Sequence, residues 1–137
     1  MMISTRGRYA LHVMIDLAEH KTDGYIPMKE VAARQEISLK YLERILPVLV
    51  KNGLVEGVQG KGGGYRLSRT PNEYTAGEIL RLTDGNLAPV ACLDCNAEVC
   101  KKKDTCKTLS MWTAFHRLTN EYFDGITIAD LANGKSI

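Results

Sequence analysis

The sequence lacks the features that define several whole classes of protein. It has no apolar run long enough to cross a bilayer, and its first residues contain no apolar secretory core. It also has no internal repeat, no low-complexity segment and no nucleophile–base pairing that fits one catalytic site. We therefore expect a cytoplasmic protein that is neither an enzyme nor bound to a membrane.

Cysteine is absent everywhere except in one short segment. Cys92, Cys95, Cys100 and Cys106 lie within fifteen residues, and the chain has no others. Because cytosolic thiols are normally kept reduced, a metal site is favoured over disulfides. Four thiolates suit either an iron–sulfur cluster, of 2Fe-2S or 4Fe-4S type, or a structural zinc ion, and spacing alone does not separate these. A redox switch through Cys92 and Cys95 is a further alternative, and a small electron-transfer protein built on the same loop is an alternative of another functional class.

Length and composition predict a single globular unit, or one domain with an appendage. Hydrophobic residues make up 45% and charged residues 25% of the 137 residues, as in ordinary globular proteins. The net charge of +2 says little about partners, but basic side chains concentrate in the first half of the chain and acidic ones weight the second. That distribution suits phosphate binding, although a solvated surface explains it about equally well.

Two short helices near the amino terminus predict a helix-turn-helix. An apolar stripe predicts a first helix from Ser4 to about Glu19, and a short helix follows over Met28–Arg34. Ser38 is a suitable N-cap for the next helix, which Gly53 ends. Pro47 should kink that helix or start a new segment. The amino-terminal end of such a recognition helix reaches base edges, so the predicted DNA-contacting residues there are Ser38, Leu39, Lys40, Tyr41, Glu43 and Arg44.

A hairpin with a glycine-rich tip follows directly. Leu54–Val58 and Tyr65–Ser68 read as strands, and the glycines between them let a basic tip approach the DNA backbone or a minor groove. A nucleotide-binding loop is the weaker alternative because no helix opens on the glycines. The predicted wing contacts are Gln59, Lys61, Gly62 and Gly63.

The second half predicts helices around the cysteine loop. Thr75 and Glu78 form a candidate capping box for a helix ending near Asp84, and Asn86–Val90 is expected to be extended. A long helix over about Thr105–Phe123 carries two apolar stripes, which favours packing against its own domain and a second subunit. The predicted dimerisation residues are Leu109, Trp112, Phe115, His116, Thr119 and Phe123. A short last helix is expected after Thr127.

Several of these motifs together resemble the Rrf-two (Rrf2) family of bacterial regulators, with its IscR-, NsrR-, RirA- and CymR-like branches. The resemblance rests on Met1–Ala10, Ile37–Leu46, Lys51–Val55, Gly60–Tyr65 and Thr75–Ile79, and continues through the cysteine loop into Leu109–Trp112. It implies a homodimer that acts as a repressor or activator and binds a roughly palindromic operator in double-stranded DNA. It also implies an iron–sulfur cluster on three cysteines, which Cys92, Cys100 and Cys106 match best.

Four positions depart from the family pattern. IscR-like members use a histidine three residues after the last cysteine, where this chain has Leu109, and NsrR-like members use an acidic residue where it has Arg8. The extra Cys95 could supply the missing fourth ligand, and Gln59 stands where an arginine is common before the wing tip.

The predicted fold class is therefore mainly α: a winged helix-turn-helix with a two-stranded β wing and a long carboxy-terminal dimerisation helix. We expect residues 1–74 to form the DNA-binding domain and residues 75–137 to form the cysteine loop and dimerisation region.

Overall fold

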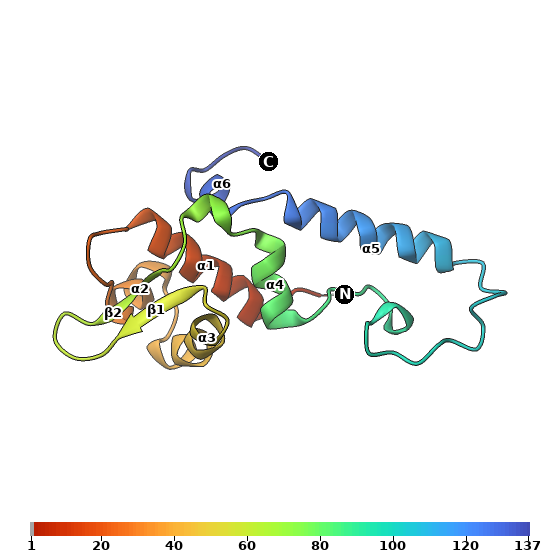
Figure 1. Cartoon of the computed structure of the whole chain (residues 1–137), viewed down its shortest axis with the longest axis horizontal. Coiled ribbons are helices and arrows are strands. Elements are labelled where there is room, and N and C mark those ends of the chain that lie inside the picture. Colours follow the sequence, from red (N-terminus) through yellow and green to blue (C-terminus); the bar gives the residue numbers. More distant parts are fainter. Residues whose placement is uncertain (1) are drawn as a thin grey trace.

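A computed structural model describes residues 2–137 and confirms the predicted architecture. The helical elements and the two strands are, in chain order, α1 Thr5–Glu19, α2 Met28–Gln35, α3 Leu39–Lys51, β1 Val55–Val58, β2 Gly64–Leu67, η1 Pro71–Glu73, α4 Ala76–Asp84, η2 Ala91–Leu93, α5 Leu109–Asp124 and α6 Ile128–Ala132. Most of them gather at one end of the molecule, and α5 leads away from this body towards the cysteine loop at the other end (Figure 1). Among residues 2–137, none of the helices combines the length and apolar character that a membrane span requires.

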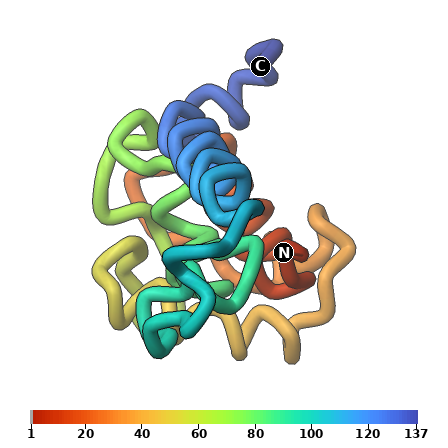
Figure 2. Tube along the Cα trace, turned by 90° about the vertical axis from the view of Figure 1, so that its right-hand side faces the viewer, coloured from red at the N-terminus to blue at the C-terminus, as the bar shows by residue number. Residues whose placement is uncertain are grey.

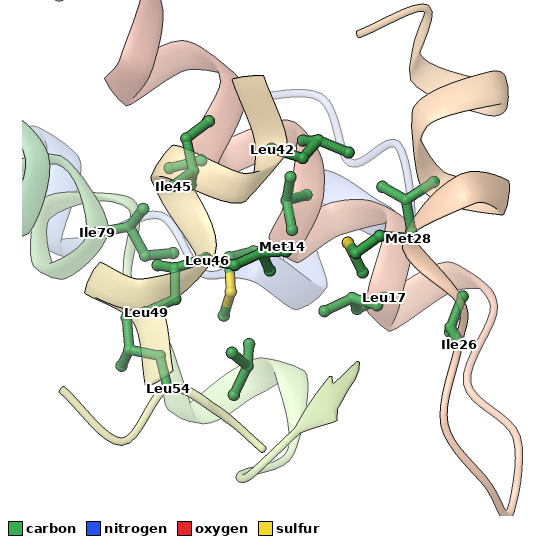
Figure 3. Close-up of a cluster of buried hydrophobic side chains, with 14 of the residues drawn as sticks. Met14, Leu17, Ile26, Met28, Leu42, Ile45, Leu46, Leu49, Leu54 and Ile79 are labelled. Carbon is green, nitrogen blue, oxygen red and sulfur yellow. The ribbon is translucent and has the colours of Figure 1, made fainter. Parts of the chain in front are cut away.

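Helix α1 is the centre of the packed body. Its amino terminus is capped by the Ser4 hydroxyl, which accepts a hydrogen bond from the Gly7 backbone N–H at 2.9 Å. Ala10, Val13 and Met14 are fully buried along one stripe, and α2, α3, β2, α4 and α6 all contact this helix. Figure 3 shows Met14 and Leu17 of α1 among side chains from α3, α4 and the segments around α2.

An ion pair between a buried carboxylate and a partly exposed guanidinium sets α2 against α1. Asp16 is fully buried within the apolar stripe, where it accepts hydrogen bonds from Arg34 Nε at 3.0 Å and Arg34 Nη2 at 2.7 Å. Gln35 Nε2 donates a third bond at 2.9 Å. The hydrogen bond to Asp16 raises the pKa of the Arg34 guanidinium above its ordinary value. The two-pronged geometry fixes orientation as well as distance, so it holds α2 in place for the helix-turn-helix.

Helix α3 forms as expected around its caps. The Ser38 hydroxyl accepts a hydrogen bond from the Tyr41 N–H at 3.1 Å, and Gly53 adopts a positive φ of 72° after the last turn. Leu42, Ile45, Leu46 and Leu49 are buried, as predicted. The helix runs without interruption through Pro47, so the alternative that a new segment starts there is wrong. Pro47 is exposed, and water can satisfy the carbonyl that it leaves without a helical partner.

The predicted hairpin is present, but β1 begins one residue later than predicted, at Val55, and β2 lies one residue earlier, over Gly64–Leu67. β1 and β2 pair antiparallel, with Val55 opposite Leu67 and Val58 opposite Gly64. Ile26 adds one further bridge, because its N–H and carbonyl bond the carbonyl and N–H of Tyr65 at 2.8 and 2.9 Å. This bridge ties the wing to the segment that precedes α2.

Three local predictions in the second half need correction. The Thr75 hydroxyl caps α4, but the Glu78 carboxylate binds Arg69 at 2.7 Å instead of completing the capping box. Asn86–Val90 is not extended throughout, because Leu87 has a φ of 59° and the Asn86 side chain accepts the Ala88 N–H at 3.2 Å. Helix α5 starts at Leu109 rather than near Thr105. The Thr105 N–H instead donates a hydrogen bond to the Lys102 carbonyl and forms a turn before the helix.

The predicted domain boundary at residue 74 stays a prediction. The hydrophobic core contains residues from both sides of this boundary. Ile79 of α4 and Ile128 of α6 are fully buried in the same cluster as the side chains of α1 and α3. A bridge between Thr75 and Thr127 brings α6 back beside the start of α4. The helix-turn-helix therefore rests on elements from both halves of the chain.

We predict that Asp16→Asn lowers the free energy of unfolding by about 2–4 kcal/mol, because it leaves Arg34 beside a buried neutral group. Urea unfolding followed by circular dichroism measures the change. The control is Glu30→Gln, which removes only the exposed carboxylate 3.8 Å from Arg34 and should cost less than about 0.5 kcal/mol. Equal losses in the two variants would contradict the structural role of the buried Asp16 carboxylate.

Candidate nucleic-acid interface and metal site

The amino-terminal end of α3 presents the predicted base-reading surface. Lys40, Glu43 and Arg44 are exposed, and no hydrogen bond or ion pair within residues 2–137 occupies the side chains of Lys40 and Arg44. Two charged side chains that point to solvent beside a helix N-terminus are suited to phosphates and base edges. Ser38 is also exposed, although its oxygen already accepts the cap hydrogen bond from Tyr41.

The other two predicted residues of α3 are half-buried and support that surface. Tyr41 packs edge-to-face against Tyr9 of α1, with ring centroids 5.0 Å apart. Leu39 packs against the buried core. Both residues therefore fix the start of α3 to the body, which is a role that the sequence pattern did not reveal.

The wing ends in a narrow tip that is largely exposed to solvent. Gln59, Lys61 and Gly62 are exposed and Gly63 is half-buried. Gly62 has a φ of 77°, a conformation that L side chains rarely adopt, so the tight turn needs glycine there. At the base of the tip, a Cβ on Gly64 would lie 2.2 Å from the Ile26 carbonyl oxygen. Glycine thus keeps the tip thin and lets the wing lie close to the body.

Three of the four cysteines line one hollow at the other end of the molecule. Cys92, Cys100 and Cys106 surround a space of about 340 Å³ together with Leu93, Val99 and Leu109, whereas Cys95 is not among its lining residues. All four side chains are exposed free thiols, and residues 2–137 contain no preformed group of three or more ligating side chains. In Figure 2 the cysteine loop lies in front of the body below the amino-terminal end of α5.

The donors in this hollow suit soft metal chemistry. Hydrogen bonding from Thr108, whose hydroxyl oxygen lies 3.4 Å from Cys106 Sγ, lowers the pKa of the Cys106 thiol. Lys102 contributes the smallest of the lowering effects, so the lysine run matters less than the neighbouring threonine. Thiolates in an apolar hollow fit zinc or an iron–sulfur cluster. Leu109, which lines the space, supplies no ligand atom.

The start of the cysteine loop is bonded to the start of α1. Asp84 ends α4, and its carboxylate accepts the Ser4 N–H at 2.9 Å and the Ser4 hydroxyl. Arg6 Nη2 donates to the Thr83 carbonyl at 2.5 Å. A Cβ on Gly7 would lie 2.7 Å from Asp84 Oδ2, so glycine permits this approach. The last residues before the cysteine loop are therefore joined directly to the start of α1.

Helix α5 leaves an apolar stripe uncovered. Met111, Phe115, Leu118 and Tyr122 are 43–58% exposed and repeat at helical spacing. Of the predicted dimerisation residues, Phe115 belongs to this stripe, whereas Leu109, Trp112, His116, Thr119 and Phe123 are half-buried. The opposite side of α5 is held to α4 by Arg81, which donates to Asn120 at 3.0 Å and to Asp124 at 2.5 Å.

Sequence reasoning missed Asp16 and Asp84 as structural anchors. A signal for Asp16 was present, since an acidic residue that interrupts an apolar helical stripe needs a buried cationic partner. Nothing in the sequence pairs Asp84 with Ser4, because the two residues are 80 positions apart.

Comparisons with known proteins agree with this architecture. Residues 3–134 match the Rrf2 family, which is described as an iron-dependent transcriptional regulator. The HTH-type transcriptional regulator IscR of Pectobacterium carotovorum is 35% identical over the whole chain and 82% of its own length.

Two solved structures have the same fold. CymR, the global cysteine regulator of B. subtilis, superposes with a TM-score of 0.81 at 33% identity and covers 99% of both chains. IscR of T. potens gives a TM-score of 0.75 at 35% identity, over 98% of this chain and 88% of that one. The chain belongs to the Rrf2 family of helix-turn-helix transcriptional regulators.

Proposed function

We propose that this regulator is a cytoplasmic homodimer whose affinity for an operator is controlled by an iron–sulfur cluster in the cysteine loop. The observation that carries the proposal is the convergence of Cys92, Cys100 and Cys106 on one hollow next to α5. When bound there, a cluster would hold the loop in one arrangement and make that arrangement sensitive to oxidants or iron supply. Cys95 is the proposed fourth ligand, since Leu109 and Arg8 cannot serve.

Zinc is the second candidate for the same thiols, because four cysteines also meet its tetrahedral requirement. A thiol–disulfide switch is the third, since all four thiols are exposed. In each case the loop would act through the contacts of Asp84 and Thr83 with the start of α1. The regulator would then distribute between two arrangements that differ in affinity for DNA.

DNA would be read by the two α3 helices of a dimer. Ser38, Lys40, Glu43 and Arg44 would face the major groove, with Leu39 and Tyr41 holding the helix start, and the wing residues Gln59, Lys61, Gly62 and Gly63 would follow the neighbouring backbone. In a twofold dimer the half-sites of a roughly palindromic operator would lie about one helical turn apart. The dimer contact would cover the apolar stripe of α5 around Phe115 and Leu118.

We predict that Arg44→Ala weakens binding to a selected duplex by about tenfold or more, because an exposed recognition-helix arginine contributes about 1–3 kcal/mol. Fluorescence anisotropy on duplexes selected by the wild-type protein from a random pool measures the loss. Lys135→Ala removes the same charge from the far end of the chain and should leave the affinity unchanged. An equal loss in both variants would mean that only net charge matters.

We predict that anaerobically purified protein is coloured and that Cys92→Ala, Cys100→Ala and Cys106→Ala each abolish the visible absorbance. Cys95→Ala should change the spectrum and speed the loss of colour in air, because a fourth ligand is replaced. Absorbance is read together with iron and zinc content, and Lys101→Ala serves as the control in the same loop. A colourless wild-type protein with stoichiometric zinc would exclude the cluster and favour the second candidate.

We predict that Leu118→Arg converts the dimer into a monomer, because it places a charge in the middle of the apolar stripe. Analytical ultracentrifugation gives the mass, and circular dichroism checks that the helices are retained. Arg117→Glu, on the neighbouring side of α5 with a side chain that is 68% exposed, is the control and should remain dimeric. If Leu118→Arg stays dimeric, the subunits meet elsewhere.

A further inference from the structure

Tyr74 is a fully buried residue that closes the open end of the wing. Its hydroxyl donates a hydrogen bond to the Leu54 carbonyl at 2.7 Å and accepts one from the Arg69 backbone N–H at 2.8 Å. Leu54 directly precedes β1, and Arg69 lies just beyond the end of β2. One phenol therefore bridges the backbone of both strands where they leave the body. Ser68 adds a parallel bond from its hydroxyl to the Gly53 carbonyl at 2.5 Å.

Leu54 also belongs to the cap of the recognition helix. Its N–H bonds the Leu49 carbonyl at 2.9 Å, and the Gly53 N–H bonds the Val50 carbonyl at 3.0 Å, the two bonds of a Schellman motif. The N–H of Leu54 is thus held by α3 and its carbonyl by Tyr74. The backbone of Leu54 is therefore held between α3 and Tyr74 at the point where the chain enters the wing.

Tyr74 is itself held rigidly from its other sides. The Arg69 guanidinium lies 4.4 Å from the ring centroid, and it binds both oxygens of Glu78 on α4, at 2.7 and 3.4 Å. The hydrogen bond to Glu78 raises the pKa of Arg69. The Tyr74 carbonyl accepts the Ile128 N–H at 3.0 Å. Tyr74 is therefore connected to α4 through Arg69, which lies over its ring, and to α6 through its backbone carbonyl.

We propose that Tyr74 is a positioning residue for DNA binding, which sets the wing at the angle where Lys61 and the start of α3 meet the same duplex. The proposal rests on the proposed function, namely that the wing contacts DNA. Its chemistry is specific to the hydroxyl, because the ring alone fills the core but cannot hold the backbone groups of Leu54 and Arg69.

The test is Tyr74→Phe, measured on the full-length protein with a duplex that the wild type selects from a random pool. We expect this variant to bind the duplex about threefold to tenfold more weakly than the wild type. We also expect the slope of log Kd against log salt concentration to be shallower by up to about 0.9, which is the value for one lost phosphate contact. General loss of folded protein would lower the active fraction without changing this slope.

A double-mutant cycle with Lys61→Ala separates the proposal from the function on which it rests. If Tyr74 acts through the wing, Tyr74→Phe causes no further loss of DNA affinity in a protein that already carries Lys61→Ala. Equal and additive losses would overturn the positioning role, and so would wild-type affinity and slope for Tyr74→Phe alone. An unchanged affinity for Lys61→Ala would instead overturn the wing contact itself. Glu78→Gln loosens Arg69 but keeps the phenol, so it offers a second variant with a smaller shift in the same direction.

Discussion

Burial of one face of α1 is the constraint on which the rest of the structure depends. Ala10, Val13 and Met14 leave no exposed surface, and α2, α3, β2, α4 and α6 pack onto this helix. Apolar contact alone would let neighbouring helices slide, since dispersion and hydrophobic burial have little directional character. Two carboxylates supply that direction: Asp16 orients α2 through Arg34, and Asp84 holds the capped start of α1.

The packed core and the exposed functional surfaces lie at opposite ends of the molecule. At one end, a packed core keeps the turn of the helix-turn-helix, the cap of α3 and the base of the wing in one arrangement. At the other end, the cysteine loop offers exposed thiols, and α5 offers an uncovered apolar stripe. An uncovered apolar stripe is unfavourable in an isolated monomer, which is the reason for proposing it as the dimer contact. The contacts of α4 with both ends make it the natural link between them (Figure 1).

Much of the fold could be predicted because its signals are local. Caps at Ser4, Ser38 and Thr127, a glycine after α3 and an apolar stripe on each helix depend on residues within a few positions of one another. The predictions that failed had a competing local partner, as when Thr105 closed a turn instead of entering α5 or Glu78 bound Arg69 instead of the backbone. Such competition is decided by which partner lies near in space.

For the candidate sites, the sequence alone determined which residue types are present: four thiols in one loop, a basic recognition helix and a thin glycine wing. It also determined the family to which these motifs point. Only the tertiary structure decided how they are grouped, with Cys92, Cys100 and Cys106 around one hollow, Tyr41 against Tyr9, and Tyr74 across the base of the wing. The physical reason is that hydrogen bonds and packing act over a few ångströms in space, and the distance between two residues in the folded chain is not encoded in their spacing along it.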